Sequence, residues 1–228
     1  MDPPTGLTCR VCRGPVRSGF ARCYQCDVAH DQAGGLLADV VAPIGYAVKG
    51  GQLADDLWRY KSGREGAAAA AARLRARLSC FLRDHGDCLW RAAGMGGAPA
   101  LAAVVPSGQG RPGPHPLLGI VRSCVELPVA RLSLRPGGAP RSRGVDVGWL
   151  RVSGHVAGED VLLVDDTWVS GGSAQSAAAA LKLAGAARVA VVVLGRHLNP
   201  ADPRSARLVR ALRPAPRPGA TARSDDRP

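Results

Sequence analysis

Residues 161–173 read Val-Leu-Leu-Val-Asp-Asp-Thr-Trp-Val-Ser-Gly-Gly-Ser, and the rest of the chain can be arranged around them. The four apolar residues at the start, two of them β-branched, are typical of a strand that is buried on both faces of a parallel sheet. Two carboxylates, Asp165 and Asp166, follow at the point where this strand is expected to end. Small and hydroxyl residues come next, and residues 174–184 then predict a helix with Ser173 near its N-cap.

The glycine turn and the acidic pair favour different parts of one ligand. Backbone N–H groups at a glycine-rich turn that begins a helix form a concave anion site, and the helix dipole favours a phosphate there. Asp165 and Asp166 would repel that phosphate, but carboxylates accept hydrogen bonds from vicinal hydroxyls, as they do with ribose. A phosphorylated pentose satisfies both halves. The alternative is an ordinary strand-turn-helix whose Asp pair caps the helix and faces water.

The thirteen residues resemble the signature of type I phosphoribosyltransferases, which is an apolar strand, two acidic residues, a short variable segment and Thr/Ser-Gly-x-Thr/Ser. In that family the acidic pair holds the ribose of phosphoribosyl diphosphate (PRPP), and the following loop holds its 5′-phosphate. The resemblance gives the ribose and the catalytic role to Asp165 and Asp166. It gives the 5′-phosphate to five consecutive residues, Val169, Ser170, Gly171, Gly172 and Ser173. Val169 replaces the usual Thr, which removes one hydroxyl donor and leaves the backbone donors in place.

Four cysteines near the N-terminus form two CxxC pairs, Cys9-Arg-Val-Cys12 and Cys23-Tyr-Gln-Cys26, separated by ten residues. Four thiolates at this spacing can close a tetrahedron around Zn²⁺. Disulfides are the alternative, and a reducing compartment favours the metal. Because all four positions are cysteine, no open position remains for a catalytic water. The pattern therefore predicts a structural zinc ribbon.

Tyr60 and Lys61 follow a short amphipathic helix that is expected over residues 52–60. A Tyr-Lys pair at the end of an N-terminal module, behind a four-cysteine head, resembles the ComF-like branch of the phosphoribosyltransferases. In that branch the module covers the active site like a hood. The resemblance implies that Lys61 faces the ligand, and a solvated lysine at a helix end is the alternative.

A second buried strand is predicted over residues 101–105, and a Pro-Ser-Gly-Gln-Gly-Arg turn ends it. In the family the loop after this strand receives the diphosphate of PRPP, and a later mobile loop closes over the ligand. The resemblance assigns the diphosphate to Ser107, Gly108, Gly110, Arg111 and Arg135, the last at the start of a Pro/Gly/Arg stretch. A Pro/Gly surface turn is the alternative for the first of these loops.

One departure from the ComF-like pattern bears on the activity. Residues 111–115 read Arg-Pro-Gly-Pro-His, where such proteins usually carry Arg-Gly-Phe-Asn-Gln. The sequence therefore supports PRPP binding more directly than transfer to an acceptor.

The remaining elements complete an alternating pattern of strands and helices. Helices are expected over residues 66–83 and 117–127, with the arginines of the first on a solvated face, and residues 84–98 are expected to form a loop. Residues 129–134 and 188–194 predict two further strands.

Composition sets the outer limits. The chain has 228 residues and a formal net charge of +12, and 27 of its 30 basic residues are arginine, since only Lys49, Lys61 and Lys182 are lysine. This basic excess fits a nucleic acid or a polyanionic metabolite and does not choose between them. The start of the chain has no apolar signal region, and its longest strongly apolar run, 189–194, cannot span a bilayer. We therefore expect a cytoplasmic protein with reduced thiols and no membrane partner.

Together these features predict an α/β fold, a Rossmann-like parallel sheet of the type I phosphoribosyltransferase class behind a small zinc ribbon. The expected boundaries are 1–35 for the ribbon, 36–200 for the α/β domain with its hood at 36–98, and 201–228 for a basic, mostly disordered tail with a short helix. The expected activity is Mg²⁺-assisted transfer of the phosphoribosyl group from PRPP to an unidentified acceptor, with release of diphosphate. The alternative is a non-catalytic PRPP-binding or competence accessory protein whose basic tail contacts DNA. The sequence specifies neither the acceptor nor the oligomeric state.

Overall fold

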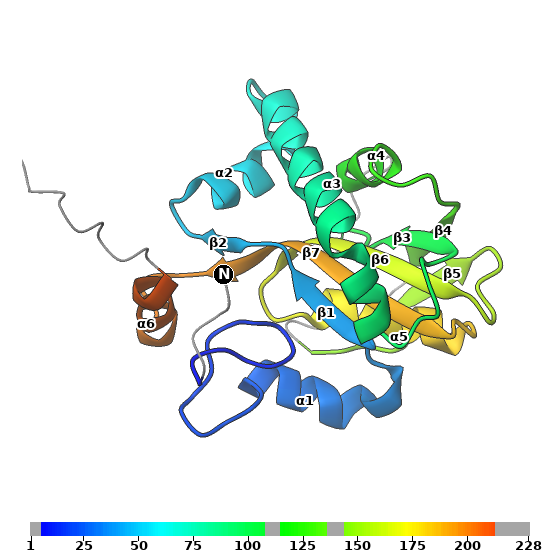
Figure 1. The fold of residues 1–228 in the computed structure, drawn as a ribbon, viewed down its shortest axis with the longest axis horizontal. Coiled ribbons are helices and arrows are strands. Elements are labelled where there is room, and N and C mark those ends of the chain that lie inside the picture. The colour runs from blue at the N-terminus through cyan, green and yellow to red at the C-terminus, as the bar shows by residue number, and fades with distance from the viewer. Residues whose placement is uncertain (1–5, 108–114, 136–143, 213–228) are drawn as a thin grey trace, which may run out of the picture.

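The structure is a computed structural model, and it describes residues 6–107, 115–135 and 144–212 (Figure 1). The helices are α1 (Tyr24–Ala33), a 3-10 turn (Gly34–Leu36), α2 (Gln52–Arg59), α3 (Ala67–Ala92), α4 (Pro116–Arg122), α5 (Gly172–Leu183) and α6 (Pro203–Leu212). The strands are β1 (Val40–Pro43), β2 (Tyr46–Val48), β3 (Leu101–Val104), β4 (Val129–Leu134), β5 (Leu150–Ser153), β6 (Asp160–Trp168) and β7 (Arg188–Leu198).

The strands form one sheet in the order β1-β7-β6-β3-β4-β5, and β2 also pairs with β7. Every pair is parallel except β4 with β5, which is antiparallel. β6 lies in the middle of this order, as a strand with a continuous apolar run should. The expected α/β fold with a largely parallel sheet is confirmed.

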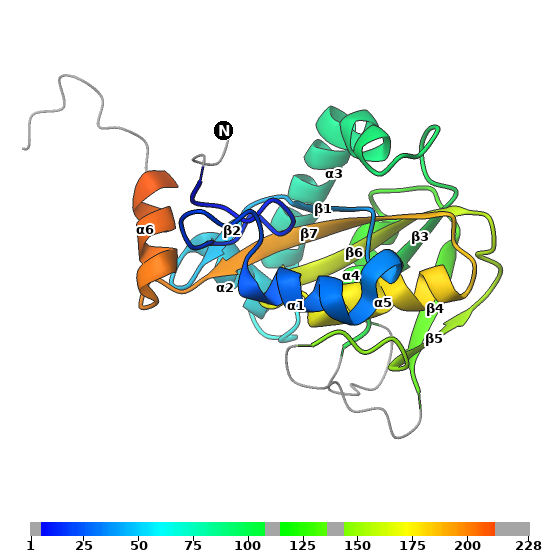
Figure 2. The ribbon, with the colours of Figure 1, turned by 90° about the horizontal axis from the view of Figure 1, so that it is seen from below.

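Helices cover both faces of the sheet. Figures 1 and 2 show α2, α3 and α4 on one face and α1 and α5 on the other. Alternate residues of β6 enter the two layers, Leu162 and Val164 on the α3 face and Val161 and Leu163 on the α5 face, and all four are fully buried. The apolar run is therefore shared between two cores.

Both central strands are longer than the sequence predicts. β6 was expected to end at Val164 but runs to Trp168, and β7 runs to Leu198 instead of Leu194. The two extensions pair with each other, Thr167 opposite Gly195 and Trp168 opposite Arg196. Because each supplies the other's backbone hydrogen bonds, polar residues remain in strand conformation there.

Several helix boundaries also differ from prediction, and α4 ends at Arg122 although a helix was expected to residue 127. α5 begins at Gly172 with Gly171 as its N-cap, so it starts two residues before the predicted residue 174, and Ser173 lies near the N-cap as expected. Gly171 has φ +89°, a left-handed conformation that glycine adopts without strain. The expected loop from residue 84 is wrong as far as Ala92, because α3 continues there and buries Leu89 and Trp90.

The cysteine-rich segment packs directly against the α/β core. Cys9, Cys12 and Cys26 belong to the same buried cluster as Leu163 and Val191 of the sheet. The boundaries expected for the ribbon, the hood and the tail stay predictions. Of the tail, α6 forms the expected short helix, and residues 213–228 lie outside the described part. Within the described residues, no helix combines the length and apolarity needed to cross a bilayer.

Candidate functional site

The acidic pair lies at the carboxyl edge of the sheet. The last β3–β6 pair is Val104 with Val164, and the Val105 N–H donates to the Val164 carbonyl at 3.0 Å. Asp165 and Asp166 are therefore the first β6 residues beyond the end of β3. In open parallel sheets, ligands bind in the crevice outside this edge. Both side chains are nearly buried, with 9% of Asp165 and 6% of Asp166 exposed.

Asp165 is held by the backbone beside it. Its Oδ1 accepts the N–H of Asp166 at 2.9 Å. Burial, and then the negative charge of Asp166, raise the pKa of Asp165 to about 8. Asp165 is therefore largely protonated at neutral pH, and a ligand that brings positive charge or donates hydrogen bonds would release this proton.

Asp166 is contacted from the hood. The hydroxyl of Tyr60 donates to Asp166 Oδ2, and the ammonium of Lys61 forms an ion pair with the same oxygen. The Lys61 side chain is only 26% exposed. Lys61 therefore turns towards the acidic pair, and the alternative of a solvated lysine was wrong.

Two contacts fix the hood above the pair. A Cβ at Gly195 of β7 would lie 2.4 Å from Leu57 Cδ1, so the absence of a side chain there lets α2 approach the sheet. Asp56 of α2 is fully buried and accepts from Arg73 of α3, with 2.6 Å between Asp56 Oδ1 and Arg73 Nη2. The hydrogen bond from Arg73 lowers the pKa of Asp56. Arg73 lies on the solvated face expected for the α3 arginines, with 47% of its side chain exposed, and it reaches from there to the buried carboxylate.

The glycine turn after β6 opens onto the N-terminus of α5. Gly171, the N-cap, offers no side-chain acceptor to the first-turn N–H groups, and Ser170 Oγ lies 3.4 Å from the Gly172 nitrogen. Val169 and Ser173 are exposed. This turn lies two strand positions past the acidic pair, so its N–H groups and the carboxylates belong to one end of the sheet.

Arg196 is a residue to which the sequence analysis gave no role. It is 7% exposed, and its Nη1 donates to the carbonyls of Trp168 at 2.9 Å, Val169 at 3.1 Å and His197 at 2.9 Å. A signal was present, because an arginine two residues after the apolar run of residues 189–194 must be buried if the strand continues. It became visible only once the extension of β7 was known.

The residues expected to bind diphosphate are only partly described. Ser107 follows β3 after Val105 and Pro106, and β3 is the neighbour of β6 in the sheet, whereas Gly108, Gly110 and Arg111 lie outside the described residues. Arg135 is held against β5, where its N–H donates to Trp149 and its Nε donates to the Leu150 carbonyl at 3.2 Å. Its assignment to the diphosphate stays a prediction.

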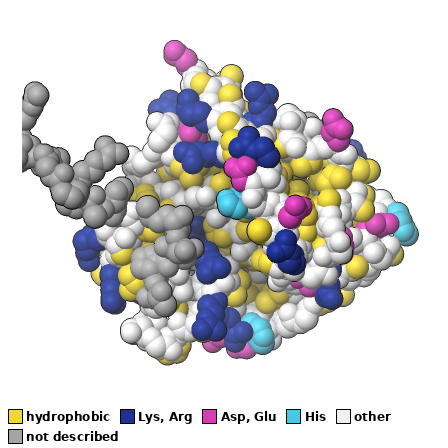
Figure 3. Space-filling model, in the orientation of Figure 1, with side chains coloured by type: hydrophobic (Ala, Val, Ile, Leu, Met, Phe, Trp, Pro, Cys, Tyr) yellow, Lys and Arg dark blue, Asp and Glu magenta, His cyan; other side chains and the backbone are white. Residues whose placement is uncertain are grey.

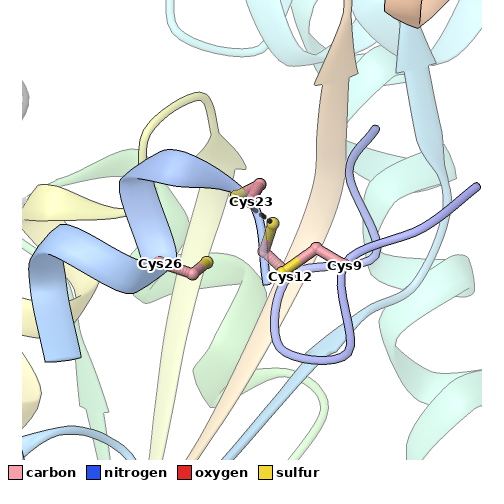
Figure 4. Close-up of side chains that lie close together, drawn as sticks. All are labelled: Cys9, Cys12, Cys23 and Cys26. Carbon is pink, nitrogen blue, oxygen red and sulfur yellow. Dashed lines mark hydrogen bonds between the residues drawn. The ribbon is translucent and has the colours of Figure 1, made fainter. Parts of the chain in front are cut away.

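The four cysteines converge from two segments (Figure 4). Their Sγ atoms all lie within 4.8 Å of one another, and those of Cys12 and Cys23 are 3.7 Å apart. A tetrahedron with Zn–S bonds of about 2.3 Å has S···S edges of about 3.8 Å, so the donor set fits zinc. Hydrogen bonds with Cys12 and Cys26 lower the pKa of Cys23 to about 7. These four cysteines could hold a metal ion.

A hollow of about 790 Å³ lies between the hood and the ends of the central strands. Thr167, the residue after Asp166, lines it together with Lys49, Trp58 and His197. Burial, followed by the charges of Arg196 and Lys49, lowers the pKa of His197. His197 is therefore a neutral hydrogen-bonding group at pH 7.

The comparisons with known proteins return solved structures only. No protein-family model and no curated protein matches the chain. Similar solved structures include a phosphoribosylpyrophosphate synthetase from Mycobacterium smegmatis, 21% identical over 57% of this chain and 36% of that chain, with a TM-score of 0.34. A purine phosphoribosyltransferase from Pyrococcus horikoshii Ot3 is 14% identical over 57% of this chain and 86% of that chain, also with a TM-score of 0.34.

A hypoxanthine phosphoribosyltransferase from Staphylococcus aureus is 13% identical over 55% of this chain and 64% of that chain, with the same TM-score of 0.34. The matched region covers little more than a third of the synthetase. At these identities and scores the function must be argued from the geometry of the site.

Proposed function

We propose that this protein binds PRPP and transfers its phosphoribosyl group to an acceptor, with release of diphosphate. One observation carries the proposal: two buried carboxylates lie near the carboxyl end of the central parallel strand, and an open glycine turn at the N-terminus of α5 follows within a few residues. The carboxylates suit vicinal hydroxyls, and the turn suits a phosphate. A phosphorylated, activated pentose combines both groups.

Each part of the site then has a role in the transfer. Asp165 and Asp166 accept hydrogen bonds from the ribose hydroxyls and stabilise positive charge that develops on the ring. The N–H groups of residues 169–173 bind the 5′-phosphate. The bond between the anomeric carbon and the diphosphate breaks with its electron pair leaving on the diphosphate, while the acceptor's lone pair forms the new bond and the acceptor then loses its proton. Bound Mg²⁺ would supply charge neutralisation at the diphosphate, with oxygen ligands mostly from PRPP itself.

In the free protein, Lys61 and Tyr60 both contact the carboxylate of Asp166. A ribose that binds Asp166 must share or replace these contacts. The hood would move with this exchange, so binding of the sugar and closure of the hood are linked. The hollow beside Thr167 supplies a place for the acceptor next to the anomeric carbon, with Trp58 and His197 on its walls.

We also infer that the chain is ComF-like, carries structural zinc and works in a reducing cytoplasm. The four converging sulfurs and the contact of the Tyr-Lys pair with Asp166 support this assignment. A role in competence would follow from the same resemblance.

Calorimetry with PRPP and Mg²⁺ tests the proposal. Replacing Asp166 by Asn should weaken PRPP binding by about 100-fold, because both hydroxyl-accepting charge and its geometry are lost. Asp160→Asn is the matched control, since it makes the same change at the opposite end of β6 and should bind like the wild type. A zinc-loaded wild type that shows no heat with PRPP would refute the proposal. Diphosphate release with a panel of nucleobases and amines then tests transfer.

A second candidate function has its own observation. A hollow of about 820 Å³ between the cysteine-rich segment and α6 is lined by Arg17, Arg204 and Arg207, with Phe20 and Tyr24 at its rim. These two aromatic rings are 64% and 74% exposed. Exposed rings among arginines are typical of surfaces that stack single-stranded nucleic acid. Figure 2 shows α6 close to the N-terminal segment, and elsewhere, on the face drawn in Figure 3, basic side chains are spread among acidic and apolar ones.

This second candidate is tested with a labelled single-stranded oligonucleotide. Phe20→Ala with Tyr24→Ala should weaken binding by about tenfold or more, and the affinity should fall as salt rises. Trp58→Ala is the matched control, because Trp58 is also exposed but lies on α2. Equal binding by both variants would exclude this surface.

A further inference from the structure

Arg196 is a buried cation whose attachment points all belong to the backbone. Its Nη1 reaches the carbonyls of Trp168 and Val169, the two residues that enter the glycine turn, at 2.9 and 3.1 Å. Within the part of the chain that the structure describes, no carboxylate lies within ion-pair distance of it. A buried guanidinium without a carboxylate needs another source of negative charge.

The opposite side of Arg196 faces the cysteine-rich segment. A Cβ at Gly14 would lie 2.2 Å from Arg196 Nη2, so the guanidinium rests against the backbone of the first CxxC knuckle. Gly14 is part of that knuckle, because its carbonyl accepts the Cys9 N–H at 2.8 Å. Zn²⁺ with four thiolates carries a net charge of about −2. A loaded metal site would therefore provide the counter-charge that Arg196 otherwise lacks.

The contact continues into the turn through Trp168. A Cβ at Gly171 would lie 2.1 Å from the Trp168 ring, so the indole packs on the N-cap of α5. The same indole lines a small cavity of about 50 Å³ together with Cys26 and Val11 of the cysteine-rich segment. The turn is thus held from the metal side by one cation and one ring.

We propose that Arg196 couples metal binding at Cys9, Cys12, Cys23 and Cys26 to the anion-binding turn at residues 169–173. The proposal rests on the proposed function for the identity of the anion. With the metal bound, the anionic thiolate cluster attracts the guanidinium of Arg196. The guanidinium in turn fixes the carbonyls of Trp168 and Val169, and these set the direction of the turn's N–H groups. Without the metal the four cysteines are no longer held together beside Arg196, its contact with the knuckle loosens, and the turn loosens with it. Arg196 acts as a positioning residue.

Coupling of this kind is reciprocal. If zinc strengthens phosphate binding by a given factor, the bound phosphate must strengthen zinc binding by the same factor. PRPP should therefore slow the loss of zinc to a chelator, although it binds on the other side of Arg196.

Hydrogen exchange on the full-length protein tests the coupling without any ligand. In the wild type, removing zinc should speed amide exchange across residues 169–175 about fivefold or more. Arg196→Met should show fast exchange whether zinc is present or not. Gly14→Ala is a second variant that pushes on the guanidinium from the ribbon side and keeps every cysteine, and it should behave in the same way. Arg188→Met, at the exposed start of β7, should behave like the wild type.

Zinc release to a coloured chelator and calorimetry with PRPP and Mg²⁺ complete the test. PRPP should slow zinc release about fivefold in the wild type and have no effect in Arg196→Met, with Arg196→Lys in between. Wild-type exchange that ignores zinc, or an unchanged zinc effect in both Arg196→Met and Gly14→Ala, would overturn the proposal. If the exchange result holds but PRPP does not bind, the proposed function fails and the coupling stands.

Discussion

The carboxyl end of β6 is contacted from two sides by different chemistry. On the hood side, Tyr60 and Lys61 contact the carboxylate of Asp166 itself. On the ribbon side, Arg196 contacts backbone carbonyls next to the pair and leaves both carboxylates alone. The hood contacts use groups that a sugar would need, so binding must exchange them. The contacts on the ribbon side can persist in both the free and the sugar-bound site.

This difference assigns the two regions different tasks. When a ligand replaces a charged contact, the residue that made the contact is released, and the hood that carries it can change its position. A contact to buried backbone sets geometry and is costly to lose. We expect changes on the ribbon side to act mainly on stability, and changes on the hood side to act mainly on ligand exchange.

Cys12→Ser is the largest test of the ribbon side. Cys12 is fully buried in the core shared with the sheet, so loss of the metal should unfold more than the ribbon. We expect the free energy of unfolding to fall by about 3 kcal/mol or more, measured by urea titration. Cys80→Ser, an exposed cysteine on α3, should be neutral. A Cys12→Ser protein as stable as the wild type would show that the ribbon is dispensable.

Gly195→Ala tests how the hood is seated. The new Cβ would meet Leu57 and Ala47, so α2 must move away from β7. We expect a loss of about 1–3 kcal/mol in unfolding free energy, together with weaker PRPP binding. Gly119→Ala is the matched control, because a Cβ in α4 meets open space and should be neutral or slightly stabilising. Similar effects from both changes would mean that the hood is not seated by this contact.

Asp165→Asn should change how stability depends on pH. Its pKa is raised from 3.8 to about 8, so the folded protein keeps a proton that the unfolded chain has lost. Wild-type stability should therefore fall as the pH rises through this range, and the variant should lack that loss. From about pH 6 to about pH 8.5, thermal melts should show Asp165→Asn gaining about 1–3 kcal/mol over the wild type. A gap that stays constant with pH would contradict the assignment, and Asp160→Asn should show no such gap.

The Lys61–Asp166 ion pair should give the smallest effect. Lys61 is partly exposed, and the ammonium is placed to be exchanged. A double-mutant cycle of Lys61→Met and Asp166→Asn should give a coupling energy of about 1 kcal/mol in urea titrations without ligand. With Asp166 retained, the destabilisation caused by Lys61→Met should shrink when PRPP is bound, as judged by ligand-dependent shifts in melting temperature. A coupling energy of several kcal/mol would show that the ion pair stabilises the fold and is not exchanged by the ligand.

Local sequence features predicted the parts that depend on local physics. The apolar run before Asp165 identified the central strand, and the CxxC spacing identified the sulfurs that converge. Gly185, just past the expected helix, ends α5 with φ +97° as a C-terminal glycine should. Each of these signals is contained within a few neighbouring residues.

Boundaries were missed where a distant partner decided them. β6 and β7 extend because each offers the other hydrogen bonds, and α3 extends because Trp90 folds over Gly86 and is buried. The pairing of exposed Arg73 with the buried Asp56, seventeen residues earlier, could not be predicted, because it depends on how α2 packs against α3.

By itself the sequence determined an α/β fold with a central strand, an acidic pair, a glycine turn and a four-thiol cluster, because each depends on short-range periodicity and spacing. Only the tertiary structure decided that Lys61 meets Asp166 and that Arg196 lies between the thiols and the turn. Those contacts join residues that are far apart in the chain, and the burial that makes their charges matter exists only once the sheet has assembled.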